Sequence, residues 1–418
     1  MSFGTNWGPH DGTSDYEQFI QGITNLSQLG KGRILVKSAG DQGYNDKDPE
    51  KNDKKRIHAE GIGSSAEGIG NTTATFNVNS NPAVQNEVLF LEIWYPKDDN
   101  YSITIQAPGG REYGPFFKGQ GTGEPGQGWY YKTNTDGIVY IHNEHWSQSS
   151  NDKRTFYFNT TDNYIFCAIA DDNIDGTAYE MKSGTWTLKM ARSSGTSNKK
   201  WDAYLLANAM DFNANFLTGF SNSKVITEPG NAKNVITVGA MNSNPINLTS
   251  DYPKNQISYF SSPGPTRDNE RNIPKPEIYA PGALIASSMA EGCTPWLPSG
   301  VTSDGKHQYL AGTSMAAPFV SGAIALLLQQ HPDWTYQQVL DRLVTTATTM
   351  TYSPIGSSTT TINYLLLNIC MLLCNNNDIC FQNPGTPSNV PSGSNLESTN
   401  KSKSFSELEK KKGGSNEK

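Results

Sequence analysis

The 418-residue sequence contains little of the material from which metal centres, disulfide frameworks and membrane spans are built. It has only five cysteines, an odd number, and no histidine lies near the last three at the spacing of zinc ligands. The longest apolar run, 364–374, is interrupted by Asn368 and is too short to cross a bilayer. The opening residues, MSFGTNWGPHDG, have neither the basic nor the apolar region of a signal peptide. We therefore expect no metal site formed by cysteines, no membrane-spanning segment and at most one disulfide.

Charge and composition limit the expected binding partners and the expected type of secondary structure. The formal net charge of -7 is mild for this length; it favours solubility and indicates no particular fold. No run of basic residues is interleaved with aromatic residues, so nucleic acid is not expected as a partner. Hydrophobic residues make up only 35% of the chain, whereas glycine and tyrosine are plentiful, with 39 and 19 residues. This mixture is typical of β-structure with many turns.

Two stretches of the chain, 1–62 and 206–365, have the pattern of an α/β fold. In each of them, helical periodicity accompanies a short continuous apolar strand, and such strands suit a parallel sheet that is buried on both faces. Glycine, or the pair His331-Pro332, separates these elements. The expected elements are a helix at 17–29, a strand at 33–36, a strand at 235–240, a helix at about 313–330 and an amphipathic helix at 334–346.

The intervening stretch, 64–205, is rich in short segments of Val, Ile, Thr, Tyr and Phe that are separated by turn residues. Several of these segments alternate between apolar and polar residues, which predicts an antiparallel sandwich inserted into the α/β fold. The final stretch, 366–418, is mostly polar and is expected to be disordered. The strands predicted for the sandwich are 73–79, 88–95, 101–107, 137–144, 154–159, 164–170 and 185–190.

The strongest chemical signal is the string Gly312-Thr313-Ser314-Met315-Ala316-Ala317-Pro318, which opens an apolar helix. A serine at this place has the free backbone N–H groups and the positive end of the helix dipole aimed at its oxygen. An acyl-transfer nucleophile requires such surroundings, because its tetrahedral intermediate carries a negatively charged oxygen. Taken alone, Ser314 could equally be a plain helix cap. The complete string favours the nucleophile.

This string and the helix that follows, FVSGAIALLLQQHPDWT, resemble the nucleophile region of the subtilisin-like serine proteases. Other segments resemble the same family in the same order along the chain, and the insertion, with Leu91-Glu92-Ile93-Trp94-Tyr95, is similar to the jelly-roll found in one bacterial-type branch of the family. The further matching segments are Ser2-Phe3-Gly4, Ser38-Ala39-Gly40-Asp41-Gln42-Gly43, Asn234 to Ala240, Ser261 to Thr266 and Lys275 to Gly282.

The resemblance implies a subtilisin-like parallel sheet flanked by helices and a serine endopeptidase that acts on polypeptides. It implies that Ser314 is the nucleophile and that Asp41 stands at the oxyanion-hole position, where the family has asparagine. It also implies two substrate-binding segments: Ser2, Phe3 and Gly4 in an edge strand that pairs with the substrate backbone, and Ser38, Ala39 and Gly40 in one wall of the pocket for the residue before the scissile bond. An extracellular or secretory location is expected for the family, whereas the sequence itself leaves the compartment unknown.

The sequence departs from the family pattern in three ways. An ionised Asp41 is acceptor-only and cannot donate to an oxyanion as asparagine does. In the family, the motifs that carry the catalytic aspartate and histidine precede the substrate-binding edge strand, and here that strand is Ser2 to Gly4; neither motif is found, so we expect the N-terminal strands of the sheet to be missing. None of the six histidines carries the motif: His10, His58, His142, His145, His307 and His331. Beyond Thr346 the sequence no longer resembles the closing strand of the family.

Calcium is the one cofactor for which the sequence offers a candidate. Residues 171–176, DDNIDG, fit the first half of a calcium loop, but the twelfth position is Lys182 and lacks the bidentate glutamate that such a loop needs. A polar hairpin turn explains the segment better, and no metal ligand is assigned.

Three interpretations of function remain open at this stage. The first is a serine endopeptidase represented by an incomplete chain. The second is a catalytically dead pseudo-protease that binds peptides, and the third is a remnant that cannot fold stably. A hydroxyl nucleophile without its base is weak, so all three predict that the chain alone has little or no peptidase activity.

Overall fold

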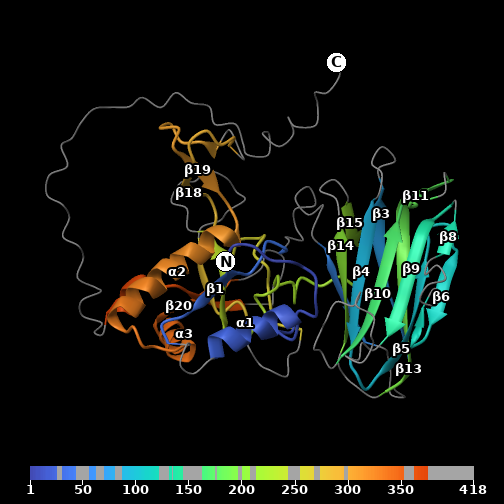
Figure 1. The fold of residues 1–418 in the computed structure, drawn as a ribbon, viewed down its shortest axis with the longest axis horizontal. Helices are drawn as coiled ribbons and strands as arrows, with labels where there is room; N and C mark the ends of the chain where they lie inside the picture. Colours follow the sequence, from blue (N-terminus) through green and yellow to red (C-terminus); the bar gives the residue numbers. More distant parts are fainter. Residues whose placement is uncertain are drawn as a thin grey trace.

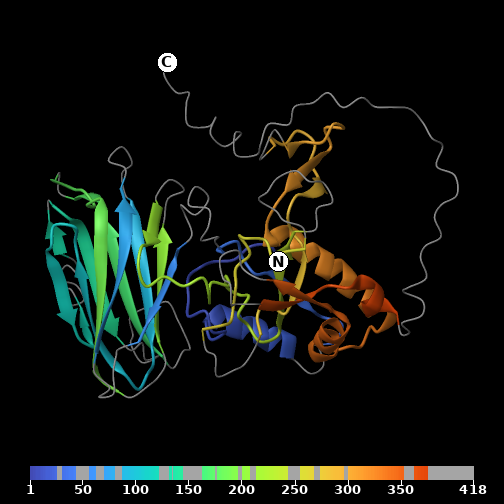
Figure 2. The same cartoon turned by 180° about the vertical axis from the view of Figure 1, so that it is seen from behind.

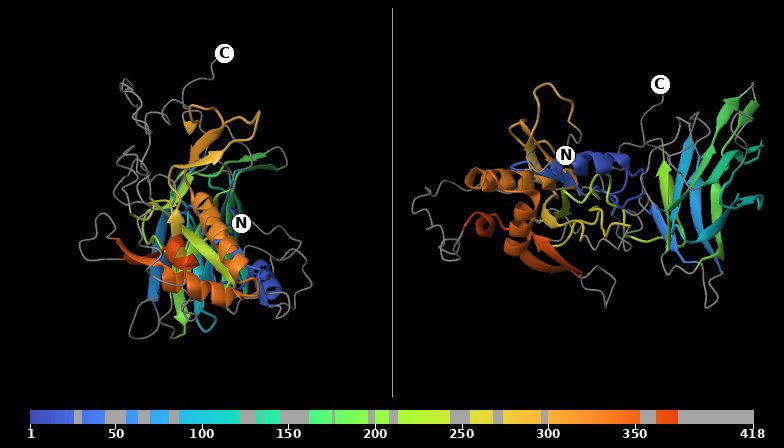
Figure 3. Two further views of the ribbon diagram at one scale, coloured as in Figure 1. Left: turned by 90° about the vertical axis from the view of Figure 1, so that its left-hand side faces the viewer. Right: turned by 60° about the horizontal axis from the view of Figure 1, so that its bottom comes forward.

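The computed structural model describes residues 1–25, 31–43, 56–62, 70–80, 87–121, 131–133, 135–144, 162–174, 177–195, 200–207, 213–242, 255–267, 274–295, 300–352 and 362–374 (Figure 1). They form an α/β unit and, beside it, two antiparallel sheets that stand face to face (Figures 2 and 3). The α/β unit is assembled from both ends of the described chain, and the antiparallel sheets come from the middle.

The α/β unit is built on a five-stranded sheet with the order β1-β16-β17-β21-β20. The first three of these strands are parallel, β21 continues in parallel to β17 through the pair Tyr279 and Leu366, and β20 is antiparallel to β21. Every residue of β16 is buried, as the continuous apolar run predicts. The strands span Leu35–Ser38 (β1), Val235–Met241 (β16), Ile278–Pro281 (β17), Thr348–Tyr352 (β20) and Ile362–Leu366 (β21).

Helices cover both faces of this sheet. Helix α2, Thr313–Gln330, packs on β1, β16 and β17, and its buried Val320 shares a core with Ile236 and Val238. Helix α1, Asp15–Asn25, places Ile20 against Val235, the neighbour of Ile236 in the same strand. Because successive strand residues point to opposite faces, α1 lies on the face opposite to α2. The small residues that follow Ser314 let α2 lie close to the sheet, with Ala316 and Ala317 fully buried.

The end of the described chain is ordered further than the sequence analysis predicts. Residues 366–374 were expected to belong to a disordered tail, but they contain helix α4, Ile369–Leu373, in contact with α2 and with α3, Tyr336–Thr346. Asn368, which interrupts the apolar run, is the N-cap of α4 and accepts the N–H of Met371. Arg342 of α3 donates to the carbonyl groups of residues 371, 372 and 374 at the other end of α4.

The two antiparallel sheets share one hydrophobic core. Every second residue of β4 and of β10 faces this core, so that Leu91 and Ile165 of one sheet share it with Phe76 and Trp186 of the other. One sheet has the order β2-β14-β4-β10-β9-β7, with β8 paired to β9; the other has the order β15-β3-β13-β5-β6. The strands span His58–Gly61 (β2), Gly70–Asn79 (β3), Val88–Tyr95 (β4), Asn100–Gln106 (β5), Glu112–Phe116 (β6), Gln120–Gly121 (β7), Tyr131–Thr133 (β8), Gly137–Glu144 (β9), Asn163–Ala170 (β10), Gly184–Ser194 (β13), Trp201–Ala207 (β14) and Asn213–Phe216 (β15).

The sheets extend beyond the predicted limits of 64 and 205. Strand β2 begins at residue 58 and β15 ends at residue 216, and both are edge strands. Their sequences, HAEG and NANF, are only four residues long, which is too short for periodicity to identify a strand. The predicted strand at 154–159 lies outside the described residues.

Two small hairpins lie outside the main sheets. Strands β18, Ile285–Ser288, and β19, His307–Leu310, form a hairpin that projects from the α/β unit near the start of α2 (Figure 1). Strands β11, Asp172–Ile174, and β12, Thr177–Tyr179, pair around the segment that resembles half a calcium loop. This hairpin agrees with the turn interpretation, although residues 175 and 176 lie outside the described part.

The two units meet through residues of the first segment of the chain. The ring of Trp7 packs on Phe90 of β4 with 5.0 Å between ring centroids, and the N–H of Gly8 donates to Glu92 Oε2 over 2.9 Å. Burial raises the pKa of Glu92 to about 7, although the two hydrogen bonds from Gly8 and from the hydroxyl of Tyr164 favour the ionised form. The segment that leads from Ser2 to Gly8 is therefore anchored on the sandwich.

Candidate active site

Ser314 lies in the first turn of α2, where the sequence predicts the nucleophile. It is half-buried, and its Oγ donates to the carbonyl oxygen of Ser2 over 3.3 Å. The Ser2 hydroxyl in turn donates to the carbonyl oxygen of Ser314 over 3.1 Å. These two hydrogen bonds join the N-terminal segment to the start of α2 across 312 positions of sequence.

Asp41 lies beside the same turn and is held by Thr313. Its Oδ1 accepts the backbone N–H of Thr313 over 2.8 Å and the Thr313 hydroxyl over 2.9 Å. A Cβ placed on Gly312 would lie 3.1 Å from Asp41 Oδ2, so the second oxygen is turned towards the peptide that leads into Ser314. An asparagine in this orientation would present its amide N–H groups there, whereas the ionised aspartate presents an acceptor.

Thr313 also fixes the segment Ser38 to Gly40, which the resemblance predicts to be one wall of a substrate pocket. Its hydroxyl oxygen accepts the N–H of Gly40 over 3.0 Å, so one side chain links the wall, Asp41 and the helix start. Ala39 is held on both sides, because its N–H donates to Val238 and its carbonyl oxygen accepts the N–H of Thr227 over 2.9 Å. The sequence analysis does not single out Thr313, although it lies inside the string that identifies Ser314.

The edge segment Ser2 to Gly4 leaves backbone groups exposed for a further strand. In the described part of the chain, no backbone hydrogen bond engages Phe3 or Gly4, while the next residue, Thr5, forms a two-way bridge with Glu228. The Phe3 side chain is 64% exposed, which is unusual for a large apolar residue. An extended peptide can therefore pair with this segment by strand addition.

Lys37 is a further charged residue at the site that the sequence analysis missed. Its side chain is fully buried, and its Nζ donates to the carbonyl oxygen of Ser38, to Ser38 Oγ over 3.3 Å and to Thr227 Oγ1 over 3.0 Å. Burial lowers the pKa of Lys37 to about 8, and the carboxylates of Asp41 and Glu17 oppose this shift. A lysine inside the buried apolar run Ile-Leu-Val-Lys was the signal available in the sequence.

No described histidine reaches Ser314. His10 is buried and bonds to the carbonyl oxygens of Ile226 and Asn6, and His58 is buried in β2. His331 ends α2 and stacks on Trp334, and His307 lies at the end of β19 that is farther from α2, in an exposed pair with Asp304. His142 lies in β9 of the sandwich, and His145 falls outside the described residues.

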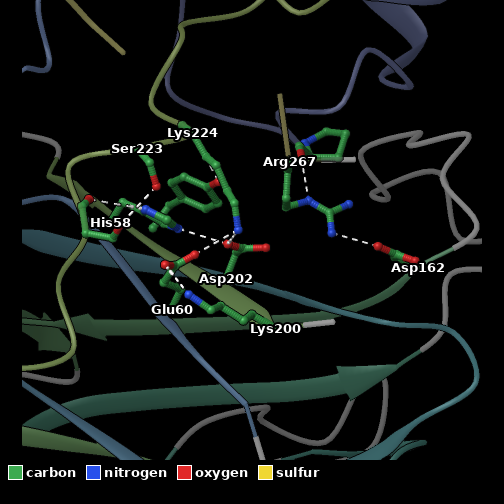
Figure 4. Close-up of polar contacts among 11 residues, drawn as sticks. His58, Glu60, Asp162, Lys200, Asp202, Ser223, Lys224 and Arg267 are labelled. Carbon is green, nitrogen blue, oxygen red and sulfur yellow. Dashed lines mark hydrogen bonds and ion pairs between the residues drawn. The ribbon is translucent and has the colours of Figure 1, made fainter. Parts of the chain in front are cut away.

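A group of His58, Glu60 and Asp202 has its possible ligand atoms within 4.8 Å of one another, as metal ligands would (Figure 4). Lys224 already supplies a cation there, because its Nζ lies 2.8 Å from both Glu60 and Asp202. His58 Nε2 bonds to Asp202 over 3.0 Å, and hydrogen bonding from His58 together with the nearby charge of Lys224 lowers the pKa of Asp202 to about 2 against the effect of burial. The group is thus an internal ion network, and its His-Asp pair is fully buried away from Ser314.

Comparison with known proteins agrees with this arrangement. The profile of the Subtilase family matches residues 213–368, which include Ser314 and α2. Residues 213–368 are thus similar to the subtilase family. The match continues past Thr346 and corrects the expectation that the family resemblance ends there. The segments around Ser2 and Ser38 lie outside this match, so their roles rest on the resemblance of their residues and on their position beside Ser314.

Individual relatives match over short stretches. An uncharacterised protein of Aquifex aeolicus is 44% identical over 108 residues, 25% of this chain and 47% of its own length. Serine protease AprX of Bacillus subtilis is 36% identical over 122 residues, 29% of this chain and 26% of its own length. Subtilisin E of the same species is 37% identical over 120 residues, which are 29% of this chain and 23% of its own length. In these matches the chain therefore spans about half of the relative's length or less.

One solved structure matches along most of the chain. The CspB protease of Clostridium perfringens aligns with 89% of this chain and 64% of its own, with a TM-score of 0.61 and 20% identity. This likeness supports the α/β subtilase fold. In the described part of the chain, no helix is both long enough and apolar enough to cross a membrane.

Proposed function

We propose that this chain is the nucleophile-bearing part of a serine endopeptidase of the subtilisin family, which cleaves polypeptides through an acyl-enzyme on Ser314. The observation that carries the proposal is the grouping of Ser314 at the start of α2 with Ser2, Thr313 and Asp41. We further propose that residues 64–205 and the adjoining edge strands are an inserted jelly-roll-like domain between the catalytic segments 1–62 and 206–365.

The site suits acyl transfer in two respects. A substrate that pairs with Ser2 to Gly4 would run past Ser314, and the free N–H groups of the first turn of α2 would stabilise the negative oxygen of the tetrahedral intermediate. Among the described residues, none lies where it could accept the proton of the Ser314 hydroxyl as a general base. In this proposal the catalytic aspartate and histidine come from residues other than those described, as the family pattern implies.

A peptide-binding pseudo-protease is the second candidate. It is favoured by the hydrogen bond from Ser314 Oγ to a carbonyl oxygen, and by Asp41, an acceptor at the position that the resemblance assigns to the oxyanion hole. Both candidates predict that the chain alone stays unlabelled by a fluorophosphonate, which reacts only with an activated serine. The probe separates them once the N-terminal part of a subtilase supplies the aspartate and histidine: labelling of Ser314 then supports the endopeptidase, and no labelling supports the pseudo-protease. We expect the chain alone to remain unlabelled at pH 7. Stoichiometric labelling that disappears in Ser314→Ala would show that a residue of this chain serves as the base.

A further inference from the structure

Lys37 has an unusual environment for a charged side chain. Among the described residues its only hydrogen-bond partners are Ser38 and Thr227, and the carboxylates of Asp41 and Glu17 favour its charged form without forming an ion pair or a hydrogen bond with it. A buried charge that is not paired with an opposite charge is unfavourable. Lys37 is therefore a site at which an incoming carboxylate would compensate an existing charge.

The ammonium group lies between the two segments that are proposed to hold the substrate. A Cβ placed on Gly4 would lie 2.9 Å from Lys37 Nζ and 2.9 Å from Thr227 Oγ1. A Cβ placed on Gly40 would lie 2.8 Å from the same Thr227 oxygen. Lys37 and Thr227 thus occupy the space directly beneath both segments.

The Ser38 hydroxyl connects this buried charge to the wall. Its oxygen accepts from Lys37, and in the described part of the chain its proton has no acceptor. The Thr227 hydroxyl differs, because its proton is directed to the carbonyl oxygen of Ala39 over 3.3 Å. A hydroxyl whose oxygen accepts from a cation is polarised and becomes a stronger donor. Both side chains are buried, Ser38 being 3% exposed, so the hydroxyl can pass the influence of the Lys37 charge only to a substrate side chain that is itself seated against the segment Ser38 to Gly40.

We propose that Ser38 and Lys37 select an acidic residue, glutamate or aspartate, immediately before the scissile bond. This inference rests on the proposed function, since it assigns the wall Ser38 to Gly40 to that substrate residue. A carboxylate accepts the Ser38 proton and neutralises the charge beneath it. A leucine at this substrate position leaves the Ser38 hydroxyl without an acceptor, and a lysine is repelled by the charge of Lys37. A glutamine accepts the hydroxyl proton but carries no charge to neutralise that of Lys37. Hydrogen bonds to charged groups contribute about 1.5–3 kcal/mol, so we expect roughly tenfold or more between glutamate and leucine.

Peptide binding to the full chain tests the inference. Four fluorescent peptides would differ only in Glu, Gln, Leu or Lys at the position before the intended scissile bond, and Kd would be measured by anisotropy at pH 7. The Ser314→Ala background keeps the peptides intact whether or not the chain cleaves them. Lys37→Met removes the charge at similar volume, Ser38→Ala removes the connecting hydroxyl, and Lys31→Met, an exposed lysine before β1, is the matched control.

The expected order of affinity is Glu, then Gln, then Leu and Lys, and the advantage of Glu over Leu should vanish in Lys37→Met and Ser38→Ala but persist in Lys31→Met. Because the pKa of Lys37 is lowered to about 8, raising the pH from 7 to 9 deprotonates it and should reduce the preference for the Glu peptide over the Leu peptide. This measurement needs no substitution at Lys37 or Ser38, so it does not depend on whether those variants fold. Equal or tighter binding of the Leu peptide at pH 7 overturns the inference and leaves the proposed function standing. Failure to bind any of the four peptides overturns both.

Discussion

The sandwich and the α/β unit bury their apolar side chains in different ways. The two antiparallel sheets enclose one layer of side chains between them, and the strands that make this layer all come from residues 58–216. The parallel sheet is buried on both faces, under α1 and α2. Its strands also need hydrogen-bonded neighbouring strands at the edges of the sheet. Among the described residues, only Met1 bonds to the outer edge of β1, through Val36 and Ser38. Both antiparallel sheets also have edge strands, such as β2 and β15, but their core is enclosed between two sheets made of described strands. The parallel sheet is buried on both faces, and on its β1 side the described residues provide only Met1, so another strand can be added there.

The largest effect is expected when that edge and the catalytic base are supplied together. Co-expression of this chain with the N-terminal part of a subtilase, carrying the aspartate and histidine motifs, should produce peptide cleavage that depends on Ser314. Loss of the histidine in subtilisin lowers kcat by about 10⁶-fold, so a gain of several orders of magnitude over the chain alone is expected. Cleavage would be measured with a fluorogenic peptide, and Ser314→Ala in the same complex is the control. If the complex forms and Ser314 still does not react with a fluorophosphonate, the pseudo-protease interpretation holds.

The second prediction concerns the independence of the sandwich. A fragment of residues 56–221 should give a β-type circular dichroism spectrum and a cooperative melt, because both sheets and their shared core lie within it. The fully buried Ile93 offers a sharper measurement, since an Ile→Ala change in a core costs about 2–5 kcal/mol of unfolding free energy. Ile93→Ala should destabilise the fragment and the sandwich transition of the whole chain equally, with the exposed Lys118→Ala as control. An unfolded fragment would show that the sandwich depends on the α/β unit.

The same difference between the units explains which features the sequence predicts. Strong periodicity and continuous apolar runs identify β4, β16 and α2 within one or two residues, because each of them buries a whole face or stripe. Strand β15 and helix α4 are not predicted, since a four-residue edge strand and a five-residue helix are set by tertiary contacts.

At the site, local sequence identifies single residues but not their neighbours. Ser314 and Asp41 are predicted by motifs, and the structure brings them to the same turn. Thr227 and Lys37 meet only through the fold, across 190 positions of sequence, so no local pattern predicts their contact. The hydrogen bond between Gly8 and Glu92, which joins the two units, is likewise invisible in the sequence.

This hydrogen bond gives the third prediction, a pH dependence of the junction between the units. The pKa of Glu92 is raised in the folded state to about 7, above the value of about 4.3 expected in the unfolded chain. The folded state therefore favours the protonated acid, and its contribution to stability is full below the unfolded pKa and lost as the pH rises through 7. Between pH 5.5 and pH 8 the loss should be about 2 kcal/mol.

Thermal melts of the full chain and of Glu92→Gln over this pH range measure the effect. Glutamine does not titrate, so the stability difference between the two proteins should shrink or change sign as the pH rises. In the isolated fragment 56–221 the Glu92 carboxyl group no longer has the N–H of Gly8 beside it, so the pH dependence of stability should differ from that of the full chain. A parallel response of wild type and Glu92→Gln at every pH would remove Glu92 as the cause.

The smallest expected effect lies within the α/β unit, at Asp41. In the complemented enzyme described above, Asp41→Asn should raise kcat by roughly tenfold or more, because an amide N–H would replace an acceptor beside the developing oxyanion. The Thr313 bonds should survive the change, since the Asn side-chain oxygen can accept the same N–H and hydroxyl that Asp41 Oδ1 accepts now. The gain should therefore appear in kcat with little change in KM, as expected for an interaction made only in the transition state. Asp41→Ala is the matched control: it removes the carboxylate without adding a donor, and it should gain less than Asp41→Asn. An equal gain in both variants would mean that Asp41 acts only by its charge, and an unchanged kcat in Asp41→Asn would place the oxyanion elsewhere.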